Sequence, residues 1–300
     1  MLVRRIKSLY TVKTIINITK VIRYIEEHLN EKLDLDMIAN AVHYSKYHLH
    51  RLFSSTLGLT IHDYVQRRQL TEAAKLLVFS DQPILNIALL SGYDSQQSFT
   101  AAFKAMYKQS PHQFRENEVF YPLQSEYKFD DPSQTSAKQY TPDDIEFAKA
   151  ADIPVWMDLV RLVIDGFPCL DESEYTTTLK MAIKQKRALI MKAGSAALGI
   201  MMISYDTASI DFLGVHPLYR KQGITRLFLS KAMDELLKNK QISITTFREG
   251  DRADTGYRKA LKELGFAEAE LLTEFGYPTQ KFILYSKPKD DEEDDHIQTL

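Results

Sequence analysis

An imperfect repeat in the first third of the chain constrains its fold more than any other feature of the sequence. Each copy carries Ile-Ala, then Tyr and Ser, then an apolar stripe and a closing aromatic residue. The first copy has Ile38, Ala39, Tyr44, Ser45, Leu49, Phe53, Thr60, His62 and Tyr64, and the second has Ile87, Ala88, Tyr93, Ser95, Phe99, Phe103, Ser110, His112 and Phe114. Each copy predicts a short helix, a tight turn and a second helix that begins after a serine N-cap and buries one apolar stripe. This is the pattern of a helix-turn-helix, and the chain carries it twice.

One continuous helix is predicted between the two copies, from Ile61 to Leu77, because this stretch has no Gly or Pro and its apolar residues recur at helical spacing. Such a helix is roughly 25 Å long, enough to hold the second helices of the two units about one turn of B-DNA apart, roughly 34 Å. We therefore expect one chain to read two successive major grooves of double-stranded DNA. An ordinary helical bundle is the alternative, and the agreement of the repeat, the connecting helix and the polar outer faces weighs against it.

Residues 15–115 resemble the double helix-turn-helix domain of AraC/XylS-type transcription regulators, and SKYHLHRLF, DSQQSFTAAFK and SPHQFR resemble its compact, MarA-like members. The resemblance implies that the outer faces of the two reading helices contact DNA. Those faces present Lys46, Tyr47, His50 and Arg51 in the first copy and Gln96, Gln97, Ser98 and Thr100 in the second. Arg suits guanine, Gln suits adenine, and Ser or Thr can bond to bases or phosphates. The sequence departs from the pattern at His43, which stands where the second copy has Gly92, and at Ala101, where the family pattern has arginine.

The charge is distributed unevenly along the chain. Residues 1–115 hold 15 Lys and Arg against 9 Asp and Glu, a net of +6, whereas the other 185 residues hold 23 against 31, a net of -8. A basic module joined to an acidic one is expected, and only the first has the balance of a phosphate-binding surface. We predict a DNA-binding domain over 1–115, a linker over 116–143 with aromatic residues that pack onto a neighbour, an α/β domain over 144–286 and an acidic tail over 287–300.

Several classes of protein are disfavoured by composition. No apolar run approaches the roughly 18 residues of a membrane span, and the N-terminus lacks the features of a secretion signal, so we expect a cytoplasmic protein without a membrane partner. The single cysteine, Cys169, excludes an intramolecular disulfide and any CxxC motif. His43, His48 and His50 straddle a turn without further ligands nearby in sequence, and we expect no metal site. The oligomeric state is left open.

The second half of the chain alternates predicted helices and strands, which favours an α/β domain built around one mixed sheet with flanking helices. Helices are expected over Pro154–Ile164, Glu174–Lys186, Ile224–Asn239 and Asp254–Leu264, and strands over Arg187–Lys192, Ala196–Ser204, Ser209–Val215, Gln241–Thr246 and Lys281–Tyr285.

One strand-to-helix junction in this domain carries residues suited to an anion. The strand SIDFLGV is followed by HPLYRKQGIT, so Arg220 to Gly223 precede a helix. The unpaired N–H groups of a helix N-terminus, the helix dipole and two cationic side chains suit a pyrophosphate. Gly223 allows close approach of the backbone. A basic turn before a helix is common, so the motif gains weight only from the strand before it and the amphipathic helix after it.

Together with LKELGF forty residues later, this junction resembles the GNAT family of acetyl-CoA-dependent N-acetyltransferases over roughly residues 144–286. The resemblance implies acetyl-CoA as cofactor, with the pantetheine arm on the backbone of Leu213 to Val215. The pyrophosphate would lie on the backbone amides of Lys221 to Thr225. The cofactor-binding family motif comprises Arg220, Lys221, Gln222, Gly223, Ile224 and Thr225. Many members carry a tyrosine acid where this chain has Leu261; Tyr257, one turn earlier, is the candidate substitute. Asp211 is the candidate general base, with a plain salt bridge as its alternative role.

Three hypotheses of different classes follow. The first is a DNA-binding transcription regulator whose C-terminal domain acetylates a small amine. In the second, the same domain binds acetyl-CoA or a related small-molecule ligand as a sensor, without catalysis. The third is an enzyme whose helical domain recruits protein rather than DNA. The polar reading helices and the +6 balance count against the third, and Leu261 shifts weight from the first to the second.

Overall fold

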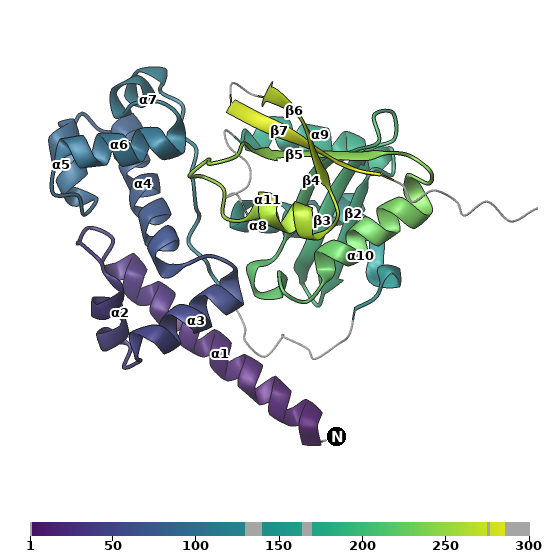
Figure 1. Ribbon diagram of the computed structural model, residues 1–300, viewed down its shortest axis with the longest axis horizontal. Helices are drawn as coiled ribbons and strands as arrows, with labels where there is room; N and C mark the ends of the chain where they lie inside the picture. Colours follow the sequence, from purple (N-terminus) through teal and green to yellow (C-terminus); the bar gives the residue numbers. More distant parts are fainter. Residues whose placement is uncertain (1, 130–139, 164–169, 275–276, 286–300) are drawn as a thin grey trace, which may run out of the picture.

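The computed structural model describes residues 2–129, 140–163, 170–274 and 277–285, with side chains from residue 14 onward. It confirms the predicted arrangement: a helical domain with two helix-turn-helix units is followed by an α/β domain, a mixed sheet with helices on both faces (Figure 1). The proposed acidic tail, 287–300, lies outside the described residues. None of the described helices has the length and apolar character needed to cross a membrane.

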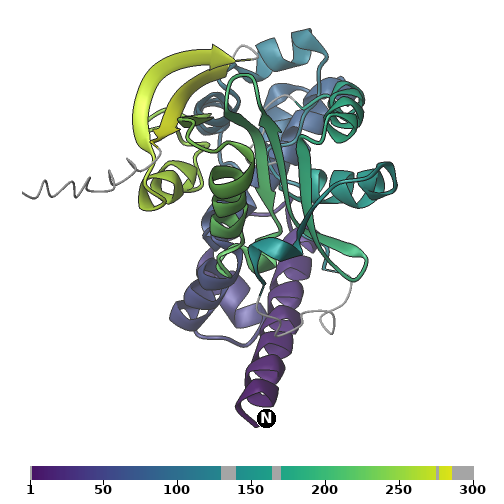
Figure 2. The same cartoon turned by 90° about the vertical axis from the view of Figure 1, so that its right-hand side faces the viewer.

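The first helix-turn-helix follows a long N-terminal helix, α1 (Leu2–Glu27), which extends beyond the rest of the helical domain (Figure 2). Its two helices are α2 (Leu35–Ala41) and α3 (Lys46–Leu57). The serine N-cap predicted for α3 is present, since the Ser45 side chain accepts a hydrogen bond from the His48 N–H. Leu49 and Phe53, on the predicted apolar stripe, are fully buried.

The second unit repeats this arrangement. The connecting helix α4 (Ile61–Phe79) leads to α5 (Ile84–Leu90), α6 (Gln96–Tyr107) and α7 (Pro111–Asn117). Ser95 caps α6 by accepting a hydrogen bond from the Ser98 N–H, and Phe99 and Phe103 are buried. At 19 residues, α4 is roughly 28 Å long, close to the predicted length.

The turn of each unit contains one residue in the left-handed region. Gly92 has φ 78°, and His43 has φ 58° at the equivalent position of the first unit. A Cβ atom on Gly92 would lie 2.7 Å from the carbonyl oxygen of Glu31, in the segment that follows α1. Glycine is therefore required at position 92 because φ is positive and because the backbone of Glu31 lies too close for a Cβ atom. His43 also has a positive φ, but its side chain is exposed.

The α/β domain is built on one seven-stranded sheet of order β1-β2-β3-β4-β5-β7-β6, antiparallel except for the β4–β5 pair. The strands are β1 (Ile145–Phe147), β2 (Ala188–Ala193), β3 (Ala196–Ser204), β4 (Ser209–Val215), β5 (Ile242–Phe247), β6 (Ala267–Glu274) and β7 (Tyr277–Leu284). The last two form a curved pair that leaves the plane of the first strands (Figure 2).

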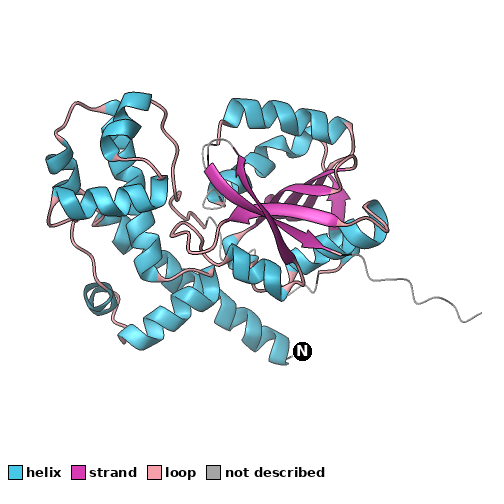
Figure 3. Ribbon diagram, turned by 45° about the horizontal axis from the view of Figure 1, so that its top comes forward, coloured by secondary structure: helices cyan, strands magenta, loops and turns pink. Residues whose placement is uncertain are grey.

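Helices cover both faces of this sheet (Figure 3). The α-helices are α8 (Ile153–Leu162), α9 (Glu172–Lys184), α10 (Ile224–Lys231) and α11 (Tyr257–Glu263), with a π-helical continuation of α10 over Ala232–Leu236 and short 3-10 turns at Pro142–Asp144, Ala150–Asp152 and Pro217–Tyr219. Trp156 of α8 and Leu179 of α9 share one buried cluster with Ile200 of β3. Phe228 of α10 and Leu261 of α11 belong to the cluster on the other face.

The strand bounds predicted for β3 and β4 are confirmed, whereas β1 and β6 were not predicted. The three residues of β1 are too few to show a period, and most of β6 is exposed and rich in glutamate. The helix predicted from Asp254 begins at Tyr257 instead, because the Asp254 carboxylate accepts hydrogen bonds from the N–H groups of Gly256 and Tyr257 as a cap. Strand β7 begins at Tyr277, four residues before the predicted bound.

The segment that follows α7 packs along α4. Tyr121, Leu123 and Tyr127 are buried, as the aromatic residues of the predicted linker suggested. The hydroxyl of Thr71 accepts hydrogen bonds from the N–H groups of Leu123 and Gln124, at 3.1 and 3.2 Å. The chain therefore leaves the helical domain along a fixed track, at least as far as the described residue 129.

Three polar contacts are among those that join the two domains. Arg67 of α4 is buried and donates to the carbonyl oxygen of Ala253, in the loop between β5 and α11. At the C-cap of α6, the Lys108 ammonium lies 2.7 Å from the carboxylate of Asp251 in the same loop. At the end of α3, the carbonyl oxygen of Leu57 accepts a hydrogen bond from the Arg220 guanidinium at 3.4 Å. Both reading helices thus meet the α/β domain at their C-terminal ends.

The two turn positions give a matched pair of stability tests. Gly92→Ala should lower the free energy of unfolding by about 2–4 kcal/mol, because a Cβ atom there adds left-handed strain and a clash with backbone. His43→Gly should change it by less than about 1 kcal/mol, since glycine relieves the strain but makes the unfolded chain more flexible. Urea unfolding measures both, and equal losses in the two variants would contradict the assignment.

Candidate functional site

The outer face of α3 presents the residues predicted to contact DNA. Lys46, Tyr47, His50 and Arg51 are all exposed, and Tyr47 retains 76% of its surface. The Lys46 ammonium pairs with Asp36 at 3.2 Å and lies 5.9 Å from the centre of the Tyr47 ring. The outer face of α3 therefore presents polar and charged side chains to solvent.

The outer face of α6 is polar and uncharged at its N-terminal end. Gln96, Gln97 and Ser98 are exposed, and Thr100 is half-buried. The Ser98 hydroxyl donates to the carbonyl oxygen of Ser95 at 2.9 Å, so this side chain is engaged in the helix cap. Among the four predicted residues of this helix, the two glutamines are the best placed to reach a partner.

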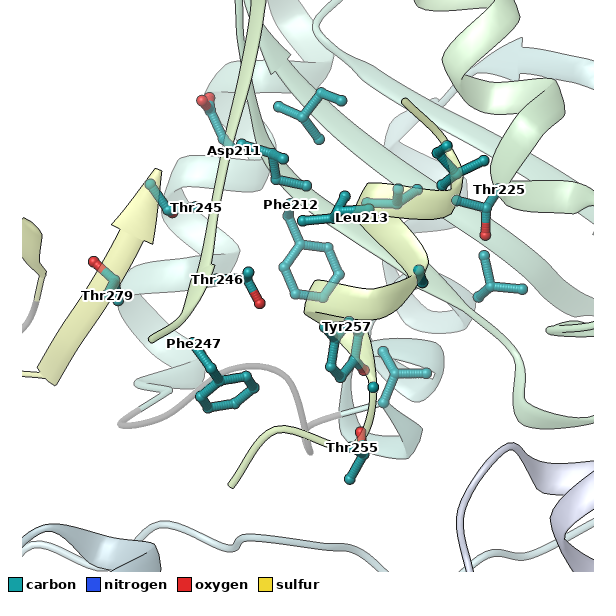
Figure 4. Close-up of a pocket in the computed structure, with 18 of the residues that line it drawn as sticks. Asp211, Phe212, Leu213, Thr225, Thr245, Thr246, Phe247, Thr255, Tyr257 and Thr279 are labelled. Carbon is teal, nitrogen blue, oxygen red and sulfur yellow. The ribbon is translucent and has the colours of Figure 1, made fainter. Parts of the chain in front are cut away.

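A cavity of about 550 Å³ opens in the α/β domain where β4 and β5 separate (Figure 4). The two strands pair only at Ser209–Ser243 and Ile210–Ile244. Beyond these pairs they diverge, so the edge of β4 from Asp211 to Val215 faces the cavity instead of a neighbouring strand. An unpaired strand edge presents backbone N–H and C=O groups to whatever occupies the space.

The cavity is lined by apolar and hydroxyl side chains from several elements, together with the charged Asp211, Arg220 and Glu274. Leu213, Val215, Arg220 and Thr225, four of the predicted cofactor residues, are among them. Lys221, Gln222 and Gly223 are exposed beside the cavity, and Ile224 is buried in the core below α10. Residues that sequence reasoning missed also line it: Gly58, Thr246, Phe247, Thr255, Tyr277 and Thr279. Gly58 belongs to the helical domain, so both domains form the cavity.

The junction before α10 has the backbone geometry of an anion site. Gly223 is the N-cap residue with φ 79°, and no side chain caps the helix there. A Cβ atom on Gly223 would meet nothing within 4 Å, so the space beside the first helical N–H groups is open. With the positive end of the helix dipole, these groups suit a negatively charged ligand.

Arg220 lines the cavity and also links the two domains. Its guanidinium is half-buried and donates to the carbonyl oxygens of Val215 and Leu57, at 3.5 and 3.4 Å. It therefore joins the end of β4 to the end of α3. Burial, and then the positive charge of Arg220, lower the pKa of His216 to about 4. The imidazole is thus neutral, and its Nδ1 accepts the Leu218 N–H at 3.3 Å, which shapes the turn.

The two predicted catalytic residues, Asp211 of β4 and Tyr257 of α11, both line the cavity. The Asp211 carboxylate lies 3.4 Å from the Arg187 guanidinium and accepts a hydrogen bond from the Ser209 hydroxyl at 2.6 Å. It points away from Tyr257, and Phe212 lies between them (Figure 4). Tyr257 begins α11 and lines the cavity. Leu261, at the usual tyrosine position, is buried but also reaches the cavity wall.

Comparison with known proteins gives the family of the helical domain. Residues 38–117 match the model of a helix-turn-helix domain. Over 102 residues, 33% of this chain and 84% of the relative, the sequence is 43% identical to the probable transcription factor PqrA of Proteus vulgaris. The transcriptional regulator Rob of Salmonella typhimurium is 42% identical over 92 residues, and this chain spans 32% of its length. The chain belongs to the AraC-type family of transcription regulators.

The AraC-type relatives match only about a third of this chain. Among solved structures, a GNAT-family acetyltransferase from Bacillus cereus is similar to 48% of this chain and 96% of its own length, with 17% identity and a TM-score of 0.37.

The exposed residues of the AraC-type reading helices give a test of base contact. Arg51→Ala and Gln97→Ala should each weaken binding to a duplex selected from a random pool by about 1–3 kcal/mol, since each removes donors suited to a base edge. Arg23→Ala, an exposed change on α1, is the control. Quantitative footprinting should show protection of two adjacent major grooves per chain. Equal losses on the selected site and on random DNA would contradict base contact.

Proposed function

We propose that this chain is a transcription regulator that reads duplex DNA with α3 and α6 and senses acetyl-CoA in its α/β domain. The observation that carries the proposal is the position of the cavity, which is lined by the cofactor strand β4 and also by Gly58 at the end of α3. A ligand in this cavity would lie against both the anion junction and the end of a reading helix.

The chemistry of the cavity wall fits acetyl-CoA. The unpaired edge of β4 supplies backbone donors and acceptors for the amide groups of a pantetheine arm. The open N-terminus of α10 beside Gly223 supplies N–H groups for a pyrophosphate, and Lys221 adds a positive charge. When bound, acetyl-CoA supplies an activated acetyl group next to the hydroxyl and apolar side chains of the cavity.

Sensing is favoured over catalysis by the state of the candidate base. The Asp211 carboxylate is engaged by Arg187 and Ser209. Asp211 would have to give up or share these two partners before it could take a proton from an amine. Leu261 stands where many GNAT-family members carry a tyrosine acid, and its side chain cannot donate a proton to the leaving sulfur.

Acetyl transfer to a small amine is the second candidate function, and the location of Tyr257 on the cavity wall favours it. In that case, the amine nitrogen would form a bond to the acetyl carbon as the carbon–sulfur bond breaks. Asp211, directly or through water, would take the proton from the amine, and the Tyr257 hydroxyl would protonate the leaving sulfur.

A physical route from the cavity to the reading helices is available in two contacts. Arg220 lines the cavity and donates to the last carbonyl group of α3. Tyr277 lines it on the other side, and its hydroxyl donates to Asp251, the carboxylate that pairs with Lys108 at the end of α6. Burial and the neighbouring Asp251 raise the pKa of Tyr277, so the hydroxyl keeps its proton. A ligand that moved Arg220 would act directly on the end of α3, and one that moved Tyr277 would act on the end of α6 through Asp251.

Cofactor binding can be tested at the anion junction. Gly223→Glu should abolish acetyl-CoA binding, because it adds a negative charge where the pyrophosphate would lie. Gly250→Glu is the matched control: this glycine also has a positive φ and open space around it, but it lies in the loop after β5 and not at the N-terminus of α10. Calorimetry on the full chain measures binding, with duplex affinity as the check on folding. Binding that survives in Gly223→Glu, or is lost equally in both variants, would contradict the site.

The sensing function predicts that acetyl-CoA and DNA affect each other's affinity. The expected coupling is about 1–3 kcal/mol, or about 5- to 150-fold, and it must be reciprocal. Titration of the selected duplex with and without saturating acetyl-CoA, at fixed salt, measures it. The change in duplex affinity caused by acetyl-CoA should disappear in Gly223→Glu. Equal DNA affinities would rule out sensing of this ligand, and release of free thiol from acetyl-CoA in the presence of an amine would instead support the second candidate.

A further inference from the structure

A groove of about 510 Å³ follows the outer face of α3, and one of its walls comes from the other domain. His50, Arg51 and Ser55 of α3 are among the residues that line it. Lys221, from the junction that precedes α10, is the residue contributed by the α/β domain. The groove therefore combines cationic and polar side chains from both domains on the surface that carries the first reading helix.

Two residues near Lys221, Leu218 and Arg220, attach the junction to the first helix-turn-helix unit. Leu218 packs against the core of the first helix-turn-helix unit. Arg220, adjacent to Lys221, donates to the Leu57 carbonyl, and its Cδ would lie 3.7 Å from a Cβ atom at Gly58. Figure 1 shows the loop before α10 beside the end of α3. Lys221 is thus held next to the reading helix by its own neighbours.

The Lys221 side chain is exposed. Within the described part of the chain, no carboxylate lies within ion-pair distance of its ammonium group, unlike Lys46 on the same surface, which pairs with Asp36. An exposed lysine beside a helix that enters a DNA groove is available for a phosphate.

We propose that Lys221 contacts a DNA backbone phosphate beside the major groove that α3 enters, so that the α/β domain forms part of the DNA interface. A major groove is bordered on each side by a sugar-phosphate backbone. When a helix lies in the groove, the protein surface beside that helix comes close to one of these two backbones. Phosphate contacts of this kind fix register and orientation without reading sequence. The inference rests on the proposed DNA reading by α3.

The test is the salt dependence of DNA binding by the full chain. Lys221→Gln should reduce the slope of log K against log salt by about 0.9, the contribution of one phosphate contact. It should also weaken binding by about five- to tenfold at roughly 0.1 M salt, equally on the selected duplex and on random duplex. Lys221→Arg should retain the wild-type slope. Lys238→Gln, an exposed change of equal charge at the far end of the π-helical turn, is the matched control.

The outcomes separate this inference from the function on which it rests. A Lys221→Gln slope equal to that of Lys238→Gln overturns the phosphate contact. If Arg51→Ala still lowers affinity for the selected duplex in that case, reading by α3 stands and only the contribution of the α/β domain fails. If Arg51→Ala has no effect either, both proposals fail. A loss in Lys221→Gln confined to the selected duplex would also overturn the inference, because a phosphate contact is independent of sequence.

Discussion

The buried guanidinium of Arg67 holds together three parts of this molecule that are far apart in sequence. Arg67 is 1% exposed and donates to the carbonyl oxygens of Leu123 and Ala253, which belong to the segment after α7 and to the loop after β5. Burying a charged group is costly unless its hydrogen-bonding groups are satisfied, so these carbonyls are held where the guanidinium can reach them. The next residue, Arg68, binds Glu26 of α1 with two nitrogens. The positions of the reading helices relative to the cavity therefore depend on the polar side of α4.

Local sequence signals were sufficient for most of the fold. The repeat and its serine caps predicted both helix-turn-helix units, and the β-branched and apolar runs predicted β3 and β4 to the residue. Burial along α4 could not be predicted in the same way. Its sequence IHDYVQRRQLTEAAKLLVF has polar residues on every face, and Arg67, Gln69 and Thr71 are nevertheless buried. Arg67 and Thr71 meet segments more than fifty residues later in the chain, and Gln69 donates to the carbonyl oxygens of Leu29 and Glu31, earlier in the chain. No local period encodes such contacts.

The same limit applies to the candidate site. Among the described residues, Gly223 leaves the open space beside the backbone that its motif predicted, and its left-handed φ is a property of the local backbone. Arg220 was predicted for the pyrophosphate from the same motif, yet it reaches the end of α3, since the helical domain supplies an acceptor there. Gly58 and Tyr277 line the cavity only because distant segments fold against β4 and β5. The alternative role considered for Asp211, a salt bridge, is present in its contact with Arg187.

The short junction from Arg220 to Gly223 has a consequence for how this protein can change over evolutionary time. Arg220 lines the cavity, and the adjacent Lys221 lines the groove beside α3. Under both proposals, the Lys221 ammonium serves two phosphate groups that cannot occupy it at once. A single substitution of Lys221 would then change both the affinity for DNA and the response to acetyl-CoA. Such a position is difficult to optimise for either property alone, and compensating changes would be expected elsewhere on α3 before either property could diverge.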